Sequence, residues 1–183
     1  MVRSNRLSII NNKIKKPPPI EIALKKMGGT IYNNCFSPGP DTPRSMASFH
    51  TGKIPNVNGC NSRLKWPRYY LKNDLKTIYD LFIEKNYEMN FFSNPNERDT
   101  GIFPEKISNM NIHNTDYNLN KYLSDIKLKD NHLIFIGLPD YHWALDDNGY
   151  THYGEKIAQK EVSRSLNIIF ENLNKDDFDH IFF

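Results

Sequence analysis

The sequence predicts an α/β protein in which a mostly parallel sheet is flanked by helices. Stretches with a strand pattern alternate with amphipathic helical stretches, the order typical of parallel sheets. Residues 133–138 are almost continuously apolar, as expected of a parallel strand that is buried on both faces. The chain has 183 residues, of which 38% are hydrophobic, so a single domain with its own core is expected over residues 1–183.

The N-terminal part predicts one helix and one strand. Three prolines at residues 17–19 form a stiff, extended approach to a helix over residues 20–27. The glycine pair at residues 28–29 is expected to end this helix. Residues 30–36, "TIYNNCF", are rich in β-branched and aromatic side chains and predict a strand.

The segment "SPGPDTPRSMASFHTGKIP", residues 37–55, predicts a short helix with a prepared start. Pro43 suits the first helical position, which makes Thr42 the expected N-cap, and Gly52 can end the helix in the left-handed conformation. The positive helix end would attract an anion, and Arg44 adds a planar cation suited to paired oxygens. The Thr42 hydroxyl is therefore placed to attack or carry an anionic ester, with an ordinary capped helix as the alternative.

The middle of the chain predicts two helices and a strand. Residues 74–87 have an amphipathic pattern with Asp74 as N-cap, and residues 87–92 form the strand that follows. Residues 93–118 are polar and rich in Asn, so an irregular excursion is expected there. Residues 119–128 predict a further helix. The side chains expected to face the core from the first of these helices are Leu75, Ile78, Leu81 and Phe82, with Tyr79 as a further candidate.

Polar side chains follow the most apolar strand. Asp140 and His142 stand at its carboxyl end, where an open α/β sheet places its ligands. We expect both to contribute to an anion-binding site, and a solvated loop is the alternative for His142. The pair Asp146-Asp147 before Asn148-Gly149 favours a turn.

The C-terminal part predicts a long helix and one more strand. Residues 154–175 have the pattern of an amphipathic helix, and residues 178–183, "FDHIFF", have that of a buried strand. The side chains expected to face the core from the helix are Ile157, Val162, Leu166, Ile169, Phe170 and Leu173.

Charge and cysteine content exclude several classes of protein. The net charge is +3, and the only basic run, residues 13–16, is interpreted as a solvated loop, so no nucleic-acid partner is expected. Cys35 and Cys60 have no partners at metal-binding spacing, and we interpret them as reduced thiols of a cytoplasmic protein. No apolar run reaches the length of a membrane span.

Residues 42–52 resemble the nucleophile segment of the sulfatase/alkaline phosphatase superfamily, which reads C-x-P-S-R, a few more residues, then T-G. Aligning Thr51-Gly52 with that T-G puts Thr42 where sulfatases have Cys or Ser. The following "KIPNVNGC" is similar to the family's G-R-x-P-x-x-x-G, and residues 6–40 resemble its run from the first metal loop to F-x-N-x-x-S. The resemblance covers about Arg3 to Cys60, and beyond it is carried by "LPDYHWALDD", the long helix and the closing strand.

The resemblance implies an alkaline-phosphatase-like fold and a metal-dependent hydrolase or transferase of phosphate or, less expectedly, sulfate esters. It implies that Thr42 is the nucleophile and a ligand of a divalent Ca, Mg, Mn or Zn ion. It also implies that Arg44 holds the ester oxygens and that His142 binds the substrate. An ester on a surface polysaccharide or its precursor is one such substrate. A Thr nucleophile excludes the formylglycine of true sulfatases and is typical of the superfamily's phosphodiesterases and phosphotransferases.

The sequence departs from the family pattern in ways that bear on activity. The sulfatase Pro and Arg positions hold Arg44 and Met46, and shifting the alignment by one residue would put Asp41 at the nucleophile position while breaking the T-G pairing. The family's first strand with Asp metal ligands and its later S-D-H-G motif have no counterpart in this sequence. We therefore expect an internal piece of a larger catalytic domain that is inactive or nearly so. The alternative is a non-catalytic, anion-binding remnant of the same fold.

Overall fold

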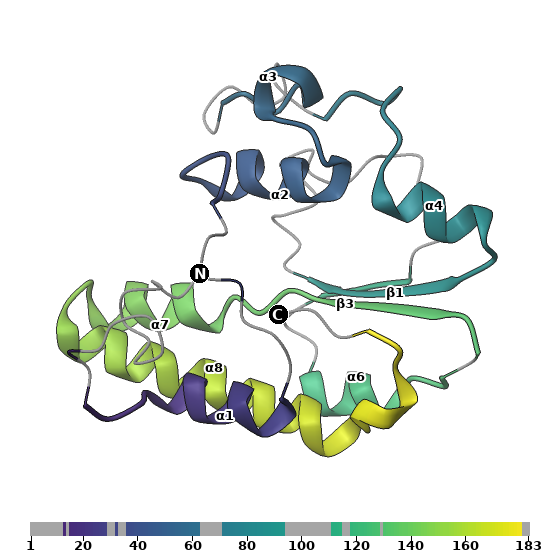
Figure 1. Cartoon of the computed structure of the whole chain (residues 1–183). Helices are drawn as coiled ribbons and strands as arrows, with labels where there is room; N and C mark the ends of the chain where they lie inside the picture. Colours follow the sequence, from purple (N-terminus) through teal and green to yellow (C-terminus); the bar gives the residue numbers. More distant parts are fainter. Residues whose placement is uncertain are drawn as a thin grey trace. The chain divides into compact units, whose positions relative to one another are not determined.

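A computed structural model describes residues 13, 15–28, 32, 36–62, 71–93, 111–114, 118–128 and 130–180. It contains helices and a parallel sheet, so the chain is a mixed α/β protein as the sequence predicts (Figure 1). The chain divides into two compact units. The helical unit comprises residues 1–34, 117–126 and 138–183, and the sheet unit comprises residues 35–116 and 127–137. The single domain expected over residues 1–183 stays a prediction.

Three parallel strands form the sheet. These are β1 (Glu88–Ser93), β2 (Asn111–Asn114) and β3 (His132–Ile136), in the order β2-β1-β3. Phe91 of β1 is paired with Ile112 on one side and with Phe135 on the other. The strand β1 is confirmed, whereas β2 corrects the expectation that residues 93–118 are wholly irregular. Ser93 ends β1 and Asn118 caps α6, and residues 94–110 and 115–117 lie outside the described residues.

The sheet core is centred on β1. Phe91 and Met89 are buried together with Tyr79, and side chains of β3 pack against them from the neighbouring strand. Each of the five residues of β3 is half-buried. The expectation that this most apolar strand is buried on both faces is therefore wrong for the described chain, because β3 has one described neighbouring strand and the central place belongs to β1.

Helix α4 (Ile78–Glu84) packs on the sheet through Tyr79, with Phe82 and Ile83 beside it. The expected N-cap Asp74 is wrong. Thr77 caps the helix instead, since its hydroxyl accepts from the Asp80 backbone N–H at 3.3 Å and the Asp80 carboxylate accepts from the Thr77 backbone N–H at 2.5 Å. The predicted apolar face is also wrong in part, because Ile78 and Leu81 are exposed.

Helix α2 (Thr42–Thr51) and the short α3 (Pro55–Asn58) form a second layer of the sheet unit. Gly52 ends α2 with φ 64°, in the left-handed conformation expected of it. Asn58 of α3 is fully buried and joins the two helices, since its amide Nδ2 donates to the Ser48 hydroxyl of α2 at 3.3 Å. The same Nδ2 donates to the Lys53 carbonyl at 3.0 Å in the connecting loop. Burial raises the pKa of the Cys60 thiol to about 11, which keeps it protonated.

The helical unit is built around α8 (His152–Asn172). Helices α1 (Pro19–Met27), α6 (Leu119–Asp125) and α7 (Asp140–Asn148) each contact α8. A short 3-10 turn, η2 (Lys175–Asp177), follows α8. The core of the unit consists of Ile20, Ala23, Tyr141, Ala144, Leu145, Ala158, Val162 and Leu166, with Leu24, Leu138, Ile157, Ile169 and Phe170 packed against it.

The two strongest helical predictions are confirmed. Helix α1 begins at a proline and ends at Gly28, which has φ 73°. Helix α8 presents five of the six predicted apolar side chains to the core, whereas Leu173 lies beyond the helix end. Helix α6 ends at Asp125, three residues before the predicted end, and Asn118 caps its start by accepting from two backbone N–H groups.

Two predicted strands and one predicted turn differ from the structure at the residues that it describes. The turn expected at Asp146-Asp147 is wrong, because these residues belong to α7, which ends before Gly149. Tyr32 and Phe36 are not in a strand, and the rest of the strand predicted over residues 30–36 lies outside the described residues. Phe178 to His180 are likewise not in a strand, and residues 181–183 lie outside the description.

Candidate functional site at the start of helix α2

The loop before α2 folds back onto the first turn of the helix. The Ser45 hydroxyl donates to the Gly39 carbonyl at 2.7 Å, and it lies 2.6 Å from the Ser37 hydroxyl. Gly39 must be small, because a Cβ there would lie 2.5 Å from the Cβ of Arg44. The sequence Ser-Pro-Gly-Pro therefore holds the loop against the residues that begin the helix.

Asp41 is the N-cap of α2, so the expected Thr42 cap is wrong by one residue. Asp41 is extended, with φ −129° and ψ 163°, and its Oδ1 accepts from the Arg44 backbone N–H at 3.1 Å. Proline lacks an N–H that the first helical turn would leave unpaired, so Pro43 is tolerated at the second helical position as well as the first. Thr42 is then the first helical residue, with an exposed side chain whose hydroxyl makes no hydrogen bond with the described residues.

Arg44 is held by the same carboxylate that caps the helix. Its Nε donates to Asp41 Oδ2 at 2.6 Å, and its Nη2 donates to the same oxygen. The Asp41 side chain is 7% exposed and that of Arg44 is 30% exposed. The hydrogen bond to Asp41 raises the pKa of Arg44, so the guanidinium stays charged. The Asp41 carboxylate thus occupies both the start of α2 and one edge of the Arg44 guanidinium. The Nη1 group of Arg44 keeps its two N–H donors for another acceptor.

His50, on the last turn of α2, is a buried titratable group of the sheet unit. It is fully buried, and its Nδ1 lies 2.5 Å from the hydroxyl of Tyr79 on α4. The ring of Phe135 on β3 lies 6.1 Å from the His50 ring. Burial lowers the pKa of His50 to about 3, which keeps the imidazole neutral near pH 7. Its place fixes α2 on α4 and the sheet, a role that sequence reasoning missed.

Asp140 and His142 lie on helix α7 rather than in a loop. Asp140 is the first residue of α7, and its Oδ1 accepts from the Ser165 hydroxyl of α8 at 2.8 Å. His142 has an exposed side chain, and its Nε2 lies 3.3 Å from Asp146 Oδ2 one turn further on. Asp140 is therefore engaged in joining two helices, and the solvated loop considered for His142 is replaced by a solvated helix face.

The four predicted site residues divide between the two units. Thr42 and Arg44 stand together on α2 of the sheet unit, whereas Asp140 and His142 belong to the helical unit. Within the part of the chain that the structure describes, no three His, Cys, Asp or Glu side chains come together to hold a metal ion. Asp41, the carboxylate beside Thr42, already accepts hydrogen bonds from Arg44, so the described residues do not form a complete metal site.

Comparisons with known protein families, with curated proteins and with solved structures found no match to this chain. Among the described residues, no helix is both long and apolar enough to cross a membrane.

Proposed function

We propose that the chain has an alkaline-phosphatase-like fold and handles phosphate, or less expectedly sulfate, esters at the start of α2. Thr42 would take the phosphoryl group from an anionic ester, such as one on a surface polysaccharide or its precursor. The observation that supports this proposal is the exposed Thr42 hydroxyl in the first turn of α2, next to a guanidinium that keeps donors available.

The proposed reaction is a single phosphoryl transfer from the ester to Thr42. The bond between phosphorus and the ester oxygen breaks, a bond to Thr42 Oγ1 forms, and the leaving alcohol takes up the hydroxyl proton. The Nη1 donors of Arg44 and the positive end of α2 would stabilise the charge on the transferring group. Thr ionises poorly near neutral pH, and the superfamily resemblance assigns its activation to a divalent Ca, Mg, Mn or Zn ion. The described residues do not complete a site for such an ion.

The test is covalent labelling of Thr42. The chain is incubated with an aryl phosphate and, separately, an aryl sulfate, in the presence of each of the four metals, and then analysed by peptide mass spectrometry. Because the chain is expected to be inactive or nearly so, we expect a phosphoryl adduct in only a small fraction of molecules, on the peptide that contains Thr42, without robust turnover. The adduct should be retained in Thr42→Ser and absent in Thr42→Ala. An adduct that persists in Thr42→Ala, or the absence of adduct and turnover with every metal, would overturn the catalytic proposal. Weak phosphate binding without chemistry or metal dependence would instead support the non-catalytic, anion-binding alternative.

Asp41→Asn is expected to raise the affinity of the α2 start for inorganic phosphate by about threefold to tenfold. Asn caps helices about as well as Asp, so the variant keeps the helix start but removes the carboxylate that competes with an external anion. The measurement is a phosphate titration followed by NMR at the Thr42 amide and the Arg44 Nε–H. Asp41→Ala is the control for the cap, with an expected loss of about 1 kcal/mol in the free energy of unfolding. Equal phosphate affinity in wild type and Asp41→Asn would mean that Asp41 does not compete.

A further inference from the structure

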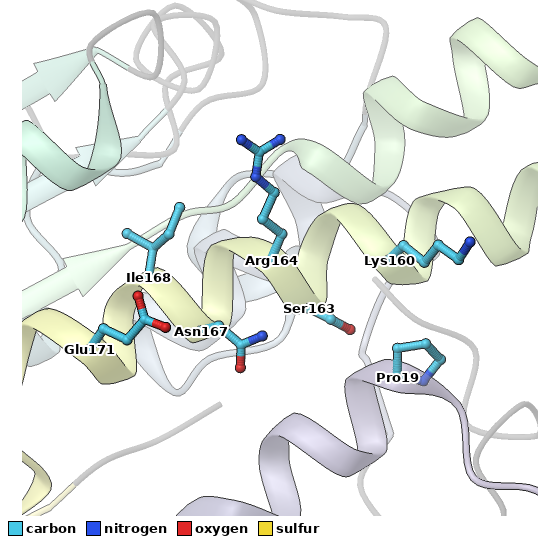
Figure 2. Close-up of a pocket in the computed structure, with 7 residues that line it drawn as sticks. All are labelled: Pro19, Lys160, Ser163, Arg164, Asn167, Ile168 and Glu171. Atoms are coloured by element: carbon cyan, nitrogen blue, oxygen red, sulfur yellow. The ribbon is translucent and has the colours of Figure 1, made fainter.

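A shallow groove runs along one face of α8 in the helical unit, next to α1. Two shallow hollows, of about 380 Å³ and 270 Å³, adjoin each other, since Asn167 and Glu171 line both. Figure 2 shows the first hollow, with Pro19 of α1 below α8 and Lys160 and Glu171 towards its two ends. The second hollow continues past the end of α8 and is lined by Lys26, Met27, Phe170, Leu173, Asn174 and Lys175 in addition to the shared pair.

Cations stand at both ends of this groove. Lys160 and Arg164 line the first hollow, and Lys26 and Lys175 line the second. All four are exposed, and none makes an ion pair with another described residue. Glu171, at the junction, is the one carboxylate among the lining residues. The groove is therefore positive on balance and complementary to an anionic ligand.

The floor of the groove is partly apolar. Pro19 and Ile168 line the first hollow, and Met27, Phe170 and Leu173 line the second. Ile168 and Phe170 are only half-buried, so a ligand could cover more of their surface. Burial of such surface favours association at roughly 25 cal/mol per Å² before the costs of binding. A fitting ligand combines acidic groups at its ends with apolar groups between them.

The length of the groove fits an extended peptide better than a small anion such as phosphate. Lys160 and Glu171, which both line the first hollow, stand 11 positions apart on α8. At a helical rise of about 1.5 Å per residue this corresponds to about 16 Å. An extended peptide covers that distance in about five residues, whereas a single phosphate could reach only one end.

From this arrangement we propose that the α8 groove binds an extended acidic peptide segment of a partner protein. Acidic side chains at least five residues apart dock near Lys160 and Arg164 in the first hollow and near Lys26 and Lys175 in the second. Apolar side chains between them cover Ile168 and Phe170. The proposal is independent of Thr42 and of any ester chemistry, since every lining residue belongs to the helical unit.

The test is a binding titration of the full chain with a fluorescent peptide that has Glu at both ends and Leu and Val between them. Lys160→Glu and Lys26→Glu are each expected to weaken binding about threefold to tenfold, one at each end of the groove. Lys156→Glu is the matched control, because Lys156 is exposed on the same helix, undergoes the same charge change and does not line the groove. Its affinity should stay within about twofold of wild type. Raising the salt concentration should weaken binding of the wild type.

Four outcomes would overturn the proposal. A loss in Lys156→Glu equal to that in Lys160→Glu would indicate unspecific attraction to the charge of α8. Equal binding of a peptide with Gln at both ends would remove the role of the acidic groups. Full competition by inorganic phosphate at equal concentration would indicate a small-anion site, and no binding of the acidic peptide at low salt would exclude the interaction. Thermal melts of each variant check that it is folded.

Discussion

Replacing Gly154 by Ala is expected to destabilise the protein by about 3 kcal/mol. Gly154 lies in the first turn of α8, where helix propensity alone predicts that Ala would be better by about 1 kcal/mol. A Cβ at this position would lie 1.9 Å from the Gly149 carbonyl oxygen and 3.1 Å from that of Asn148. Both atoms are backbone, so the end of α7 and the start of α8 would have to move apart. The short distance to these carbonyl oxygens therefore makes Gly154→Ala destabilising, although helix propensity alone predicts that it would stabilise the protein.

The measurement is urea-induced unfolding of wild type and Gly154→Ala. Gly52→Ala is the control, because Gly52 has φ 64° but no atom within 4 Å of a Cβ built there. That variant should lose only about 1 kcal/mol, the cost of a left-handed conformation for a residue with a side chain. A Gly154→Ala variant as stable as wild type, or more stable, would contradict the close packing of α7 on α8.

Acid is expected to weaken the sheet unit through His50, by on the order of 4 kcal/mol between about pH 6.5 and pH 3. Burial lowers the pKa of His50 to about 3 in the folded protein, from an ordinary value of 6.5. The unfolded chain therefore binds this proton more readily than the folded one. The contribution of neutral His50 to the free energy of unfolding is fully present above about pH 6.5. It is lost as the pH falls towards the pKa of the folded state, by about 1.4 kcal/mol per pH unit.

Two variants separate the titration of His50 from its hydrogen bond with Tyr79, because each changes one partner of that bond. His50→Gln removes the titrating group, so its free energy of unfolding should depend less on pH than that of wild type below about pH 6.5. Tyr79→Phe removes the hydroxyl that lies 2.5 Å from Nδ1 but keeps the buried imidazole, so it should lose about 1 kcal/mol and retain the pH dependence. Unfolding curves at about pH 7 and about pH 4.5 provide the measurement. Identical pH profiles for wild type and His50→Gln would show that His50 does not titrate on unfolding.

Helices with local start and stop signals could be predicted from the sequence, and elements that depend on distant partners could not. Helix α1 has a proline start and a glycine end, and α8 has a long apolar stripe, so both were predictable. Helix α7 carries Asp146-Asp147 and Asn148-Gly149, which read locally as a turn. Burial of Tyr141, Ala144 and Leu145 against α8 outweighs that local preference.

The strands show the same dependence on partners. The strand β2 consists of Asn-Ile-His-Asn, which has little strand propensity of its own and is held by pairing with β1. The run of β3 was correctly predicted as a strand, but its apolar composition suggested a central place that β1 takes instead. The order of the strands in the sheet depends on pairing between distant parts of the chain. The composition of a single strand therefore does not predict it.

At the candidate site, sequence reasoning found the residues but not their relation. Thr42 and Arg44 were placed at a helix start, which is where they lie. Asp41 was not recognised as the partner of Arg44, although an Asp three residues before an Arg at a helix start is a detectable signal. His50 gave no signal, because its hydrogen bond is to Tyr79, 29 positions further along the chain.

The division of the chain between its two units has a consequence for protein engineering and for folding. The backbone passes from one unit to the other after residues 34, 116, 126 and 137, so neither unit is a contiguous stretch of sequence. No single cut or gene boundary can yield either unit whole, and an expression clone that spans residues 35–116 would omit β3. Many native contacts join distant parts of the sequence, and such topologies fold slowly because long loops must close first. We therefore expect limited proteolysis at the crossing points to produce nicked fragments that stay associated rather than separable domains.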